Sequence, residues 1–140
     1  MQIGGDILAF TVGSKDCKAT VSVLRLLLES QDEPKVEMLP SLEGEHQYAK
    51  QYAVALYMNA FVYLTGGKGA SSCLVSQFNL ADRSWTQAPS LNQGRHGHSS
   101  CTLCDTLYVF GGKRGSEPVL SIESIKPDVD RKWTTIVADN

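Results

Sequence analysis

Two stretches of this chain resemble each other, and their repetition constrains the fold more than any other feature. Residues 50–68 read KQYAVALYMNAFVYLTGGK, and residues 95–113 read RHGHSSCTLCDTLYVFGGK. Aligned without a gap, Lys50 matches Arg95, Asn59 matches Cys104, and both stretches end in a double glycine followed by lysine. A period of 20–50 residues is typical of repeat architectures, in which each repeat is one supersecondary unit.

Each repeat contains the pattern of four short strands. Two apolar runs separated by a turn come first, YAVALYM and FVYLT in one repeat and SSCTL and LYVF in the other. This arrangement predicts a β-hairpin. After the glycines comes a third, alternating run (LVSQFNL or VLSIESI), then a polar turn (ADRS or PDVDR), then a strand led by tryptophan (SWTQAPSL or KWTTIVA). The sequence therefore predicts two four-stranded, up-and-down antiparallel sheets.

The N-terminal part carries a weaker version of the same pattern. ILAFTVG (7–13) fits the second strand, TVSVLRLLLE (20–29) the third, and VEMLPSL (36–42) the fourth, with Val36 in the place of the tryptophan. The leucines and arginine of SVLRLLLE also suit a helix, but the flanking repeat favours a strand. The first strand is expected to be missing, because only MQIGGD precedes Ile7.

The glycine-rich stretch LTGGKGASS (64–72) raises the alternative of a phosphate-binding loop. A P-loop requires G-x-x-x-x-G-K-[ST] between a strand and a helix. Here the residue after Lys68 is Gly69, and the run that follows alternates as a strand does. The stretch is therefore interpreted as the turn that leaves the second strand, with Lys68 on the rim.

The repeat resembles the Kelch repeat. The residues that carry the resemblance are a double glycine, an aromatic residue three positions before it, a tryptophan in the fourth strand and an arginine at the start of the repeat: Gly66, Gly67, Gly111, Gly112, Tyr63, Tyr108, Trp85, Trp133 and Arg95. The likeness is strong over 50–139 and weak over 1–49. It implies an all-β fold of Kelch-type β-propeller blades that pack face to face, with the tryptophans buried between blades.

The expected organisation is three four-stranded blades in one structural unit that forms an open arc. The first, incomplete blade spans 1–49, and the complete blades span 50–94 and 95–140. At such strand ends, glycine allows positive φ or a close backbone approach.

Composition excludes several classes of function. The formal net charge is −2, whereas a nucleic-acid-binding protein usually presents a clearly basic face. No apolar run reaches the ~20 residues of a transmembrane helix, and the N-terminus has neither the charge of a signal peptide nor that of a transit peptide. Four cysteines are too few for a disulfide scaffold. We expect an intracellular, cytoplasmic protein, with an organelle or cytoskeletal assembly left open.

The segment H-x-H-x2-C-x2-C, formed by His96, His98, Cys101 and Cys104, resembles a zinc site. In an extended strand its ends would lie roughly 26 Å apart at ~3.3 Å per residue, too far to share one tetrahedral ion. We therefore expect no metal and no cofactor. Asp105 is interpreted as a turn residue, and no catalytic residue is identified.

A set of rim residues is the candidate binding site. In an up-and-down blade, the start of the first strand and the end of the second lie on one edge. In Kelch adaptors the matching positions often contact the partner peptide. This predicts a basic partner-binding rim that attracts an acidic peptide, made of Ser14, Lys50, Gln51, Lys68, Arg95, His96, Lys113 and Arg114. The alternative is a solvated loop rim without a partner.

These features indicate a non-enzymatic protein–protein interaction module. An open arc would expose apolar blade faces, which mark interaction sites. The favoured hypothesis is a structural subunit or scaffold piece whose partners are other protein subunits, a second copy or a complementary propeller fragment. One alternative is the substrate-recognition module of a ubiquitin-ligase adaptor, although nothing in 1–49 resembles a BTB or F-box region. Another is part of a galactose-oxidase-like enzyme.

Overall fold

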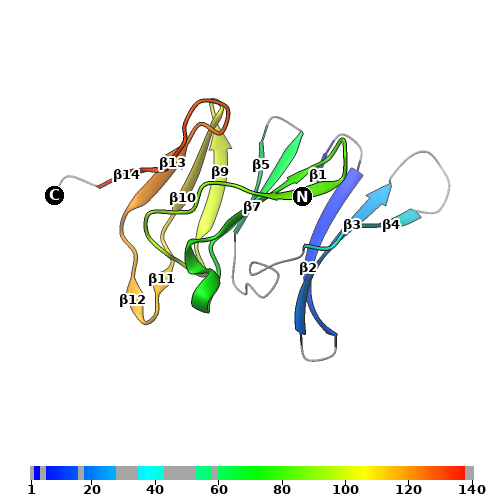
Figure 1. Cartoon of the computed structure of the whole chain (residues 1–140), viewed down its shortest axis with the longest axis horizontal. Helices are drawn as coiled ribbons and strands as arrows, with labels where there is room; N and C mark the ends of the chain where they lie inside the picture. Colours follow the sequence, from blue (N-terminus) through cyan, green and yellow to red (C-terminus); the bar gives the residue numbers. More distant parts are fainter. Residues whose placement is uncertain are drawn as a thin grey trace. The chain divides into compact units, whose positions relative to one another are not determined.

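The computed structural model describes residues 2–3, 6–15, 18–27, 35–42, 53–57 and 60–137 (Figure 1). Side-chain burial is described for 36–42, 60–69 and 72–137. Backbone contacts divide the chain into two compact units, Met1–Tyr48 and Ala49–Asn140. Each unit is described separately below. The expectation of a single structural unit stays a prediction.

The first unit contains one antiparallel sheet in the order β1-β2-β3-β4. Its strands are β1 (Gln2–Ile3), β2 (Asp6–Lys15), β3 (Lys18–Leu27) and β4 (Lys35–Leu39). The leucine-rich run is a strand, β3, so the helix alternative is wrong. The first strand, expected to be missing, is present in short form as the two residues of β1. We refer to this sheet as blade 1.

The second unit contains two four-stranded sheets. Blade 2 has the order β5-β6-β7-β8, with β5 (Ala53–Tyr57), β6 (Phe61–Thr65), β7 (Val75–Asn79) and β8 (Ser84–Gln87). Blade 3 has the order β9-β10-β13-β14, with β9 (Ser99–Leu103), β10 (Thr106–Phe110), β13 (Ile122–Ile125) and β14 (Thr134–Ile136). The up-and-down antiparallel sheets confirm the all-β blade architecture.

The two blades differ after the double glycine. Blade 2 has a 3-10 turn, η2 (Gly69–Cys73), before its third strand. Blade 3 has a small hairpin there, β11 (Lys113–Arg114) and β12 (Glu117–Pro118), which projects from the end of the sheet (Figure 1). The third strands therefore start at different distances from the glycines.

Strand pairing corrects the ungapped alignment of the first strands. Ala55 pairs with Tyr63, and Cys101 pairs with Tyr108. Because the two tyrosines are equivalent, Cys101 is the structural equivalent of Ala55. The ungapped alignment instead matched Cys101 with Leu56, so the first strands are shifted by one residue. The turn between β9 and β10 of blade 3 has only two residues, Cys104 and Asp105. Their φ angles are positive, at 47° and 55°, as in a type I′ hairpin turn.

The core of the second unit lies between the facing sides of blades 2 and 3. Trp133 is 2% exposed there, and its indole Nε1 donates a 2.7 Å hydrogen bond to the carbonyl oxygen of Pro89. Trp85 is only half-buried, and the centroid of its ring lies 4.9 Å from the ring centroid of Phe78 on the neighbouring strand. The prediction of a tryptophan buried between blades is thus confirmed for Trp133. The core cluster contains Tyr63, Val75, Leu91, Leu107, Val109, Ile125 and Trp133.

Both double glycines adopt left-handed backbone conformations. Gly66 and Gly67 have φ of 66° and 135°, and Gly111 and Gly112 have φ of 70° and 83°. Gly66 also lies so close to the next blade that an added Cβ would be 2.5 Å from the carbonyl oxygen of Arg95. The predicted roles of positive φ and close approach are both confirmed.

Candidate protein-interaction surface

One side of blade 3 faces blade 2, and strand pairing identifies the residues on the opposite side. Tyr108 is opposite Cys101 on β9 and Ser124 on β13, while Phe110 is opposite Ser99 and Ile122. Ile122 is in turn opposite Ile136 on β14. We call this side the outer face of blade 3. Its strand positions are Ser99, Cys101, Leu103, Thr106, Tyr108, Phe110, Ile122, Ser124, Thr134 and Ile136.

The outer face is uncharged and partly apolar. None of its strand positions holds an Asp, Glu, Lys or Arg residue. Large apolar side chains on it are exposed to solvent: Leu103 by 63%, Phe110 by 41%, Ile122 by 38% and Ile136 by 42%. Depletion of charge together with exposed aromatic and aliphatic side chains is typical of the centre of protein interfaces.

The segment 88–95 joins blade 2 to blade 3 and is hydrogen-bonded to both. Toward blade 2, the amide of Leu91 donates to the carbonyl of Cys73, and the amide of Arg95 donates to the carbonyl of Ser72, both at 2.9 Å. In return the amide of Gly67 donates to the carbonyl of Arg95 at 2.9 Å. The joining segment thus fixes blade 3 against the edge of blade 2.

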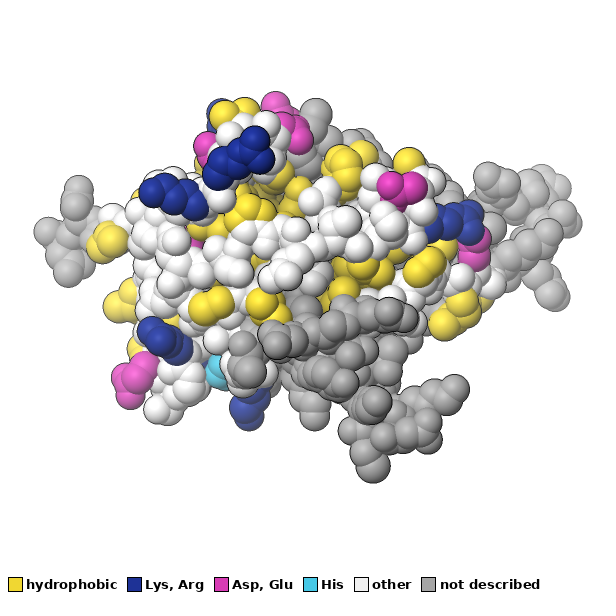
Figure 2. Space-filling model, viewed as in Figure 1, with side chains coloured by type: hydrophobic (Ala, Val, Ile, Leu, Met, Phe, Trp, Pro, Cys, Tyr) yellow, Lys and Arg dark blue, Asp and Glu magenta, His cyan; other side chains and the backbone are white. Residues whose placement is uncertain are grey.

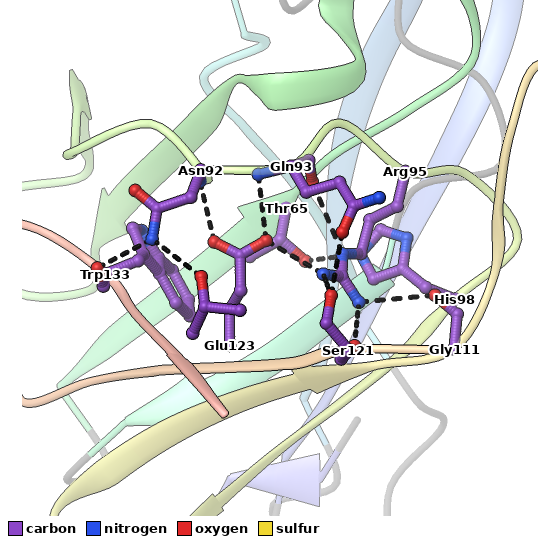
Figure 3. Close-up of polar contacts among 10 residues, drawn as sticks. Thr65, Asn92, Gln93, Arg95, His98, Gly111, Ser121, Glu123 and Trp133 are labelled. Carbon is purple, nitrogen blue, oxygen red and sulfur yellow. Dashed lines mark hydrogen bonds and ion pairs between the residues drawn. The ribbon is translucent and has the colours of Figure 1, made fainter. Parts of the chain in front are cut away.

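Toward blade 3, the joining segment is held by Glu123 of β13 (Figure 3). The Glu123 carboxylate accepts hydrogen bonds from the amides of Asn92 (2.6 Å) and Gln93 (3.0 Å). The Asn92 side chain donates to the carbonyl oxygen of Trp133 at 2.8 Å. These bonds satisfy a buried acid with backbone donors, as a buried charge requires.

The guanidinium of Arg95 completes this network. Its Nη2 lies 2.8 Å from Oε1 of Glu123, and its Nη1 donates to the carbonyl oxygen of Ser121 at 2.8 Å. The side chains of Arg95 and Glu123 are both 0% exposed. The position of Arg95 therefore differs from the exposed rim that the sequence predicted, because a carboxylate on β13 and several carbonyls replace its water shell.

Other predicted rim residues lie at an exposed edge of blades 2 and 3. The backbones of His96 and Lys113 exchange two hydrogen bonds, and His96 Nε2 lies 3.2 Å from the carbonyl oxygen of Gly115. Lys68, Lys113 and Arg114 are exposed. Figure 2 shows basic side chains with a histidine and an acidic side chain near one another on the molecular surface. We call Lys68, His96, Lys113 and Arg114 the basic rim.

The remaining predicted rim residues do not join this cluster in the structure. Ser14 lies near the end of β2 in the first unit, and only its backbone is described. Lys50 and Gln51 lie outside the described residues. Their participation in a rim stays a prediction.

His98 is a buried histidine at the contact between the two blades. Its Nε2 lies 2.9 Å from Oγ1 of Thr65, and its Nδ1 has no hydrogen-bond partner among the residues that the structure describes. The pKa of His98 is lowered from 6.5 to about 4, mainly by burial and in addition by the positive charge of Arg95 and by the nearby His96. The imidazole is consequently neutral at physiological pH.

The four residues of the zinc-like motif are dispersed. His96 is half-buried and His98 is buried, while Cys101 and Cys104 are exposed. In the part of the chain that the structure describes, no three His, Cys, Asp or Glu side chains gather as metal ligands. Cys73, Cys101 and Cys104 are free thiols.

Sequence reasoning missed the polar residues that fix the joining segment: Asn92, Gln93, Ser121 and Glu123. One signal was available, since Glu123 interrupts the otherwise apolar or hydroxyl-bearing run VLSIESI. An acid on a strand that faces a core needs a buried partner. Arg95 was a possible partner for Glu123. The sequence alone could not pair them, because they come from distant segments that become neighbours only when the register of the sheet is known.

Within the described residues, the structure has no helix of the length and apolar character needed to cross a membrane.

Comparisons with known proteins agree with this architecture. Residues 94–137, which include all of blade 3, match the Kelch motif. The chain is 31% identical over 86 residues to human Kelch-like protein 6, covering 61% of this chain and 14% of the relative. It is 26% identical over 117 residues to Kelch-like protein 23 of Pongo abelii, covering 80% and 20%.

A third relative comes from a different kind of animal. The chain is 25% identical over 99 residues to beta-scruin of Limulus polyphemus, covering 64% of this chain and 11% of the relative. The chain thus spans between 11% and 20% of the length of these relatives. The double glycines, the buried tryptophan and the four-stranded sheets agree with these matches, which identify residues 94–137 as a Kelch motif and show that the chain is similar to Kelch-repeat proteins.

Proposed function

We propose that this chain is a non-enzymatic, structural protein–protein interaction module that joins a larger intracellular assembly through the outer face of blade 3. One observation carries the proposal: four large apolar side chains, on all four strands of this sheet, are exposed on a face without charge. Burying such a face would remove apolar surface from water at about 25 cal/mol per Å².

Covering the outer face of blade 3 with another protein surface should be energetically more favourable than leaving it exposed to water. Monomeric proteins rarely leave contiguous apolar patches of several hundred Å² bare, and larger patches mark binding sites. The opposite face of the same sheet, with Leu107 and Val109, is fully buried against blade 2. Both faces of blade 3 therefore have the composition of a sheet that is covered on two sides.

Sedimentation velocity of the tagged full chain in extracts of its own cells tests this proposal. The wild type should sediment as a particle larger than the 15.3 kDa chain. Phe110→Asp combined with Ile122→Asp should shift it to the monomer, because two buried carboxylates cannot be solvated at the interface.

Val129→Asp is the matched control. Val129 is exposed but lies in the turn between β13 and β14, outside the outer face. This variant should remain in the assembly. A wild type that sediments as a monomer, or a double variant that sediments with the wild type, would overturn the proposal.

A second candidate function is recognition of an acidic peptide by the basic rim. Exposed Lys68, Lys113 and Arg114 favour it, together with the backbone bonds that hold His96 beside Lys113. Such a site would attract carboxylates or phosphates electrostatically, with a salt-dependent association rate.

Charge reversal distinguishes this candidate from a solvated rim. A variant with Lys68→Glu, Lys113→Glu and Arg114→Glu should lose binding of an Asp/Glu-rich peptide in a fluorescence anisotropy titration. Arg95 is left intact because its side chain is buried in the ion pair. Equal binding of the peptide by variant and wild type would exclude recognition by the basic rim.

A further inference from the structure

We infer that Ser116 is a phosphorylation site for a protein kinase that selects basic residues before its acceptor, and that the phosphate cancels much of the positive charge of the basic rim. The modification site goes beyond the proposed function, whereas its effect on peptide binding rests on the second candidate function. The inference follows from the hairpin of β11 and β12, which has Ser116 at its tip.

The tip of this hairpin is exposed on all sides. Arg114 pairs with Glu117, so only Gly115 and Ser116 form the turn. Gly115 has a φ of 64°, as the first turn residue of a type II′ hairpin has. A Cβ added at Gly115 would meet no atom of the described residues within 4 Å. Every residue of 113–118 is exposed, and the hairpin projects from the end of the sheet (Figure 1). Ser116 is therefore accessible to an enzyme.

Two positive charges precede Ser116 at a spacing that one class of protein kinase recognises. Lys113 lies three positions before the serine and Arg114 two positions before it, and both side chains are exposed. Both residues form β11, so this part of the substrate is already extended. Kinases select substrates through such charge patterns, which complement charges of opposite sign in their active-site cleft.

The hairpin is also built to open without unfolding the blade. Its ladder has two residue pairs, between Lys113–Arg114 and Glu117–Pro118, and Pro118 has no amide proton to donate. The base of the hairpin is anchored separately, since the amide of Val119 donates to the carbonyl of Gly112 at 2.9 Å and Val119 is 2% exposed. An exposed ladder this short opens locally while the core stays folded.

One other serine or threonine of the chain has two basic residues at the same spacing, and the fold protects it. Arg131 and Lys132 precede Thr134 by three and two positions. Between them and Thr134 stands Trp133, which is 2% exposed, and Thr134 itself pairs with Ser124 of β13. Placing this segment in a kinase cleft would pull Trp133 out of the core. The sequence thus offers two acceptors, and the structure selects Ser116.

The reaction takes its phosphoryl group from ATP. The Oγ of Ser116 forms a bond to the γ-phosphorus while the bond from that phosphorus to the bridging oxygen of ADP breaks. The hydroxyl proton passes to the catalytic aspartate of the kinase, and ADP is released. The product carries about −1.5 to −2 charges at pH 7, next to the positive Lys113 and Arg114 and close to His96, whose Nε2 lies 3.2 Å from the carbonyl oxygen of Gly115.

Phosphate mapping on the folded full chain tests the site. The chain is incubated with Mg-ATP and the catalytic subunit of cyclic-AMP-dependent protein kinase, which recognises basic residues before its acceptor, and phosphate is located by mass spectrometry of peptides. Phosphate should be found on Ser116 and not on Thr134. Synthetic peptides of residues 110–121 and 128–137 should both accept phosphate, because neither contains a folded blade.

The inference is wrong if the folded chain receives no phosphate on Ser116, or as much on Thr134 as on Ser116. A 128–137 peptide that accepts no phosphate would overturn the selection by the fold.

Variants test the role of the preceding charges. Arg114→Ala should lower the rate of Ser116 phosphorylation about tenfold or more, the effect of losing a hydrogen bond to a charged group, and Arg114→Lys should lower it less. Arg131→Ala is the matched control, since it removes an exposed arginine outside the hairpin and should leave the rate unchanged. Equal rates for Arg114→Ala and Arg131→Ala would contradict recognition of the hairpin by its charges.

The effect on the basic rim is measured separately. The chain phosphorylated on Ser116 should bind the Asp/Glu-rich peptide about tenfold more weakly than the unmodified chain at low salt, because like charges then face each other. Equal affinity of the two forms would overturn this effect. If neither form binds the peptide, the second candidate function fails, while the phosphorylation site is decided by the mapping alone.

Discussion

Arg95 and Glu123 form an ion pair 2.8 Å long in which neither side chain is exposed to solvent. Arg95 ends the joining segment and Glu123 lies on β13, so the pair connects the entry of blade 3 to the middle of its sheet. The same carboxylate accepts two amides of the joining segment (Figure 3). The pair therefore determines where the chain enters the blade.

Glu123→Ala should lower the free energy of unfolding by about 3–5 kcal/mol, the range for leaving one partner of a buried ion pair uncompensated. The loss arises because Arg95 would keep a buried charge and the amides of Asn92 and Gln93 would lose their acceptor. Urea denaturation followed by tryptophan fluorescence measures it, since Trp133 lies in the same network.

The double variant with Arg95→Leu and Glu123→Leu is the control. It should lose less stability than the sum of Arg95→Leu and Glu123→Leu measured separately, because no unpaired charge remains. Additive losses would show that the two side chains are not energetically coupled.

The two glycines of one pair should respond differently to substitution. Gly111→Ala should lower the free energy of unfolding by about 1–2 kcal/mol, the cost of positive φ alone, because an added Cβ would meet no atom of the described residues within 4 Å. Gly112→Ala should cost more, since its Cβ would lie 2.6 Å from the carbonyl oxygen of His96.

Thermal unfolding of the two alanine variants compares these costs directly. Gly66→Ala should resemble Gly112→Ala, because its Cβ would contact the carbonyl oxygen of Arg95. Equal melting temperatures for Gly111→Ala and Gly112→Ala would contradict a steric role for the second glycine.

The free energy of unfolding should decrease as the pH is lowered from 6.5 to 4, because the pKa of His98 is lowered in the folded chain. The pKa of His98 is about 4 in the folded chain and 6.5 as the ordinary value, so the unfolded chain binds more protons in this interval. Stability therefore rises with pH there and is fully present above pH 6.5. Over this interval the contribution of His98 to the free energy of unfolding changes by at most about 3 kcal/mol.

Urea midpoints across this pH range, compared with those of His98→Gln, measure the effect. The variant lacks the titrating imidazole, and carboxylates elsewhere contribute equally to both proteins. The wild type should therefore show the steeper loss of stability below pH 6.5. Parallel pH profiles would contradict the assignment of a lowered pKa to His98.

The strands could be predicted because alternation and turn residues are local signals. FVYLT and SSCTL coincide with β6 and β9, and the repeat correctly favoured a strand for the leucine-rich run of β3. The glycines were informative since their positions require positive φ. In contrast, the tight turn at Cys104 has positive φ at residues other than glycine, so nothing in the residue types indicated the one-residue shift of β9.

The position of Arg95 could not be predicted for a different reason. Arginine is usually exposed, and its burial depends on Glu123, which becomes a neighbour only when β13 is in register. The sequence predicted that a blade face would be exposed. The residues of the outer face could be identified only from the pairing of β9, β10, β13 and β14.

The most direct test of the central claim is the alkylation of Cys101 in the assembly isolated from the protein's own cells, with Cys104 as internal reference. The claim that the outer face of blade 3 is an interface predicts that Cys101 reacts much more slowly in the assembly than in the purified chain, whereas Cys104 changes little. If Cys101 reacts equally fast in the assembly and in the purified chain, the outer face is not an interface and the proposed function is wrong.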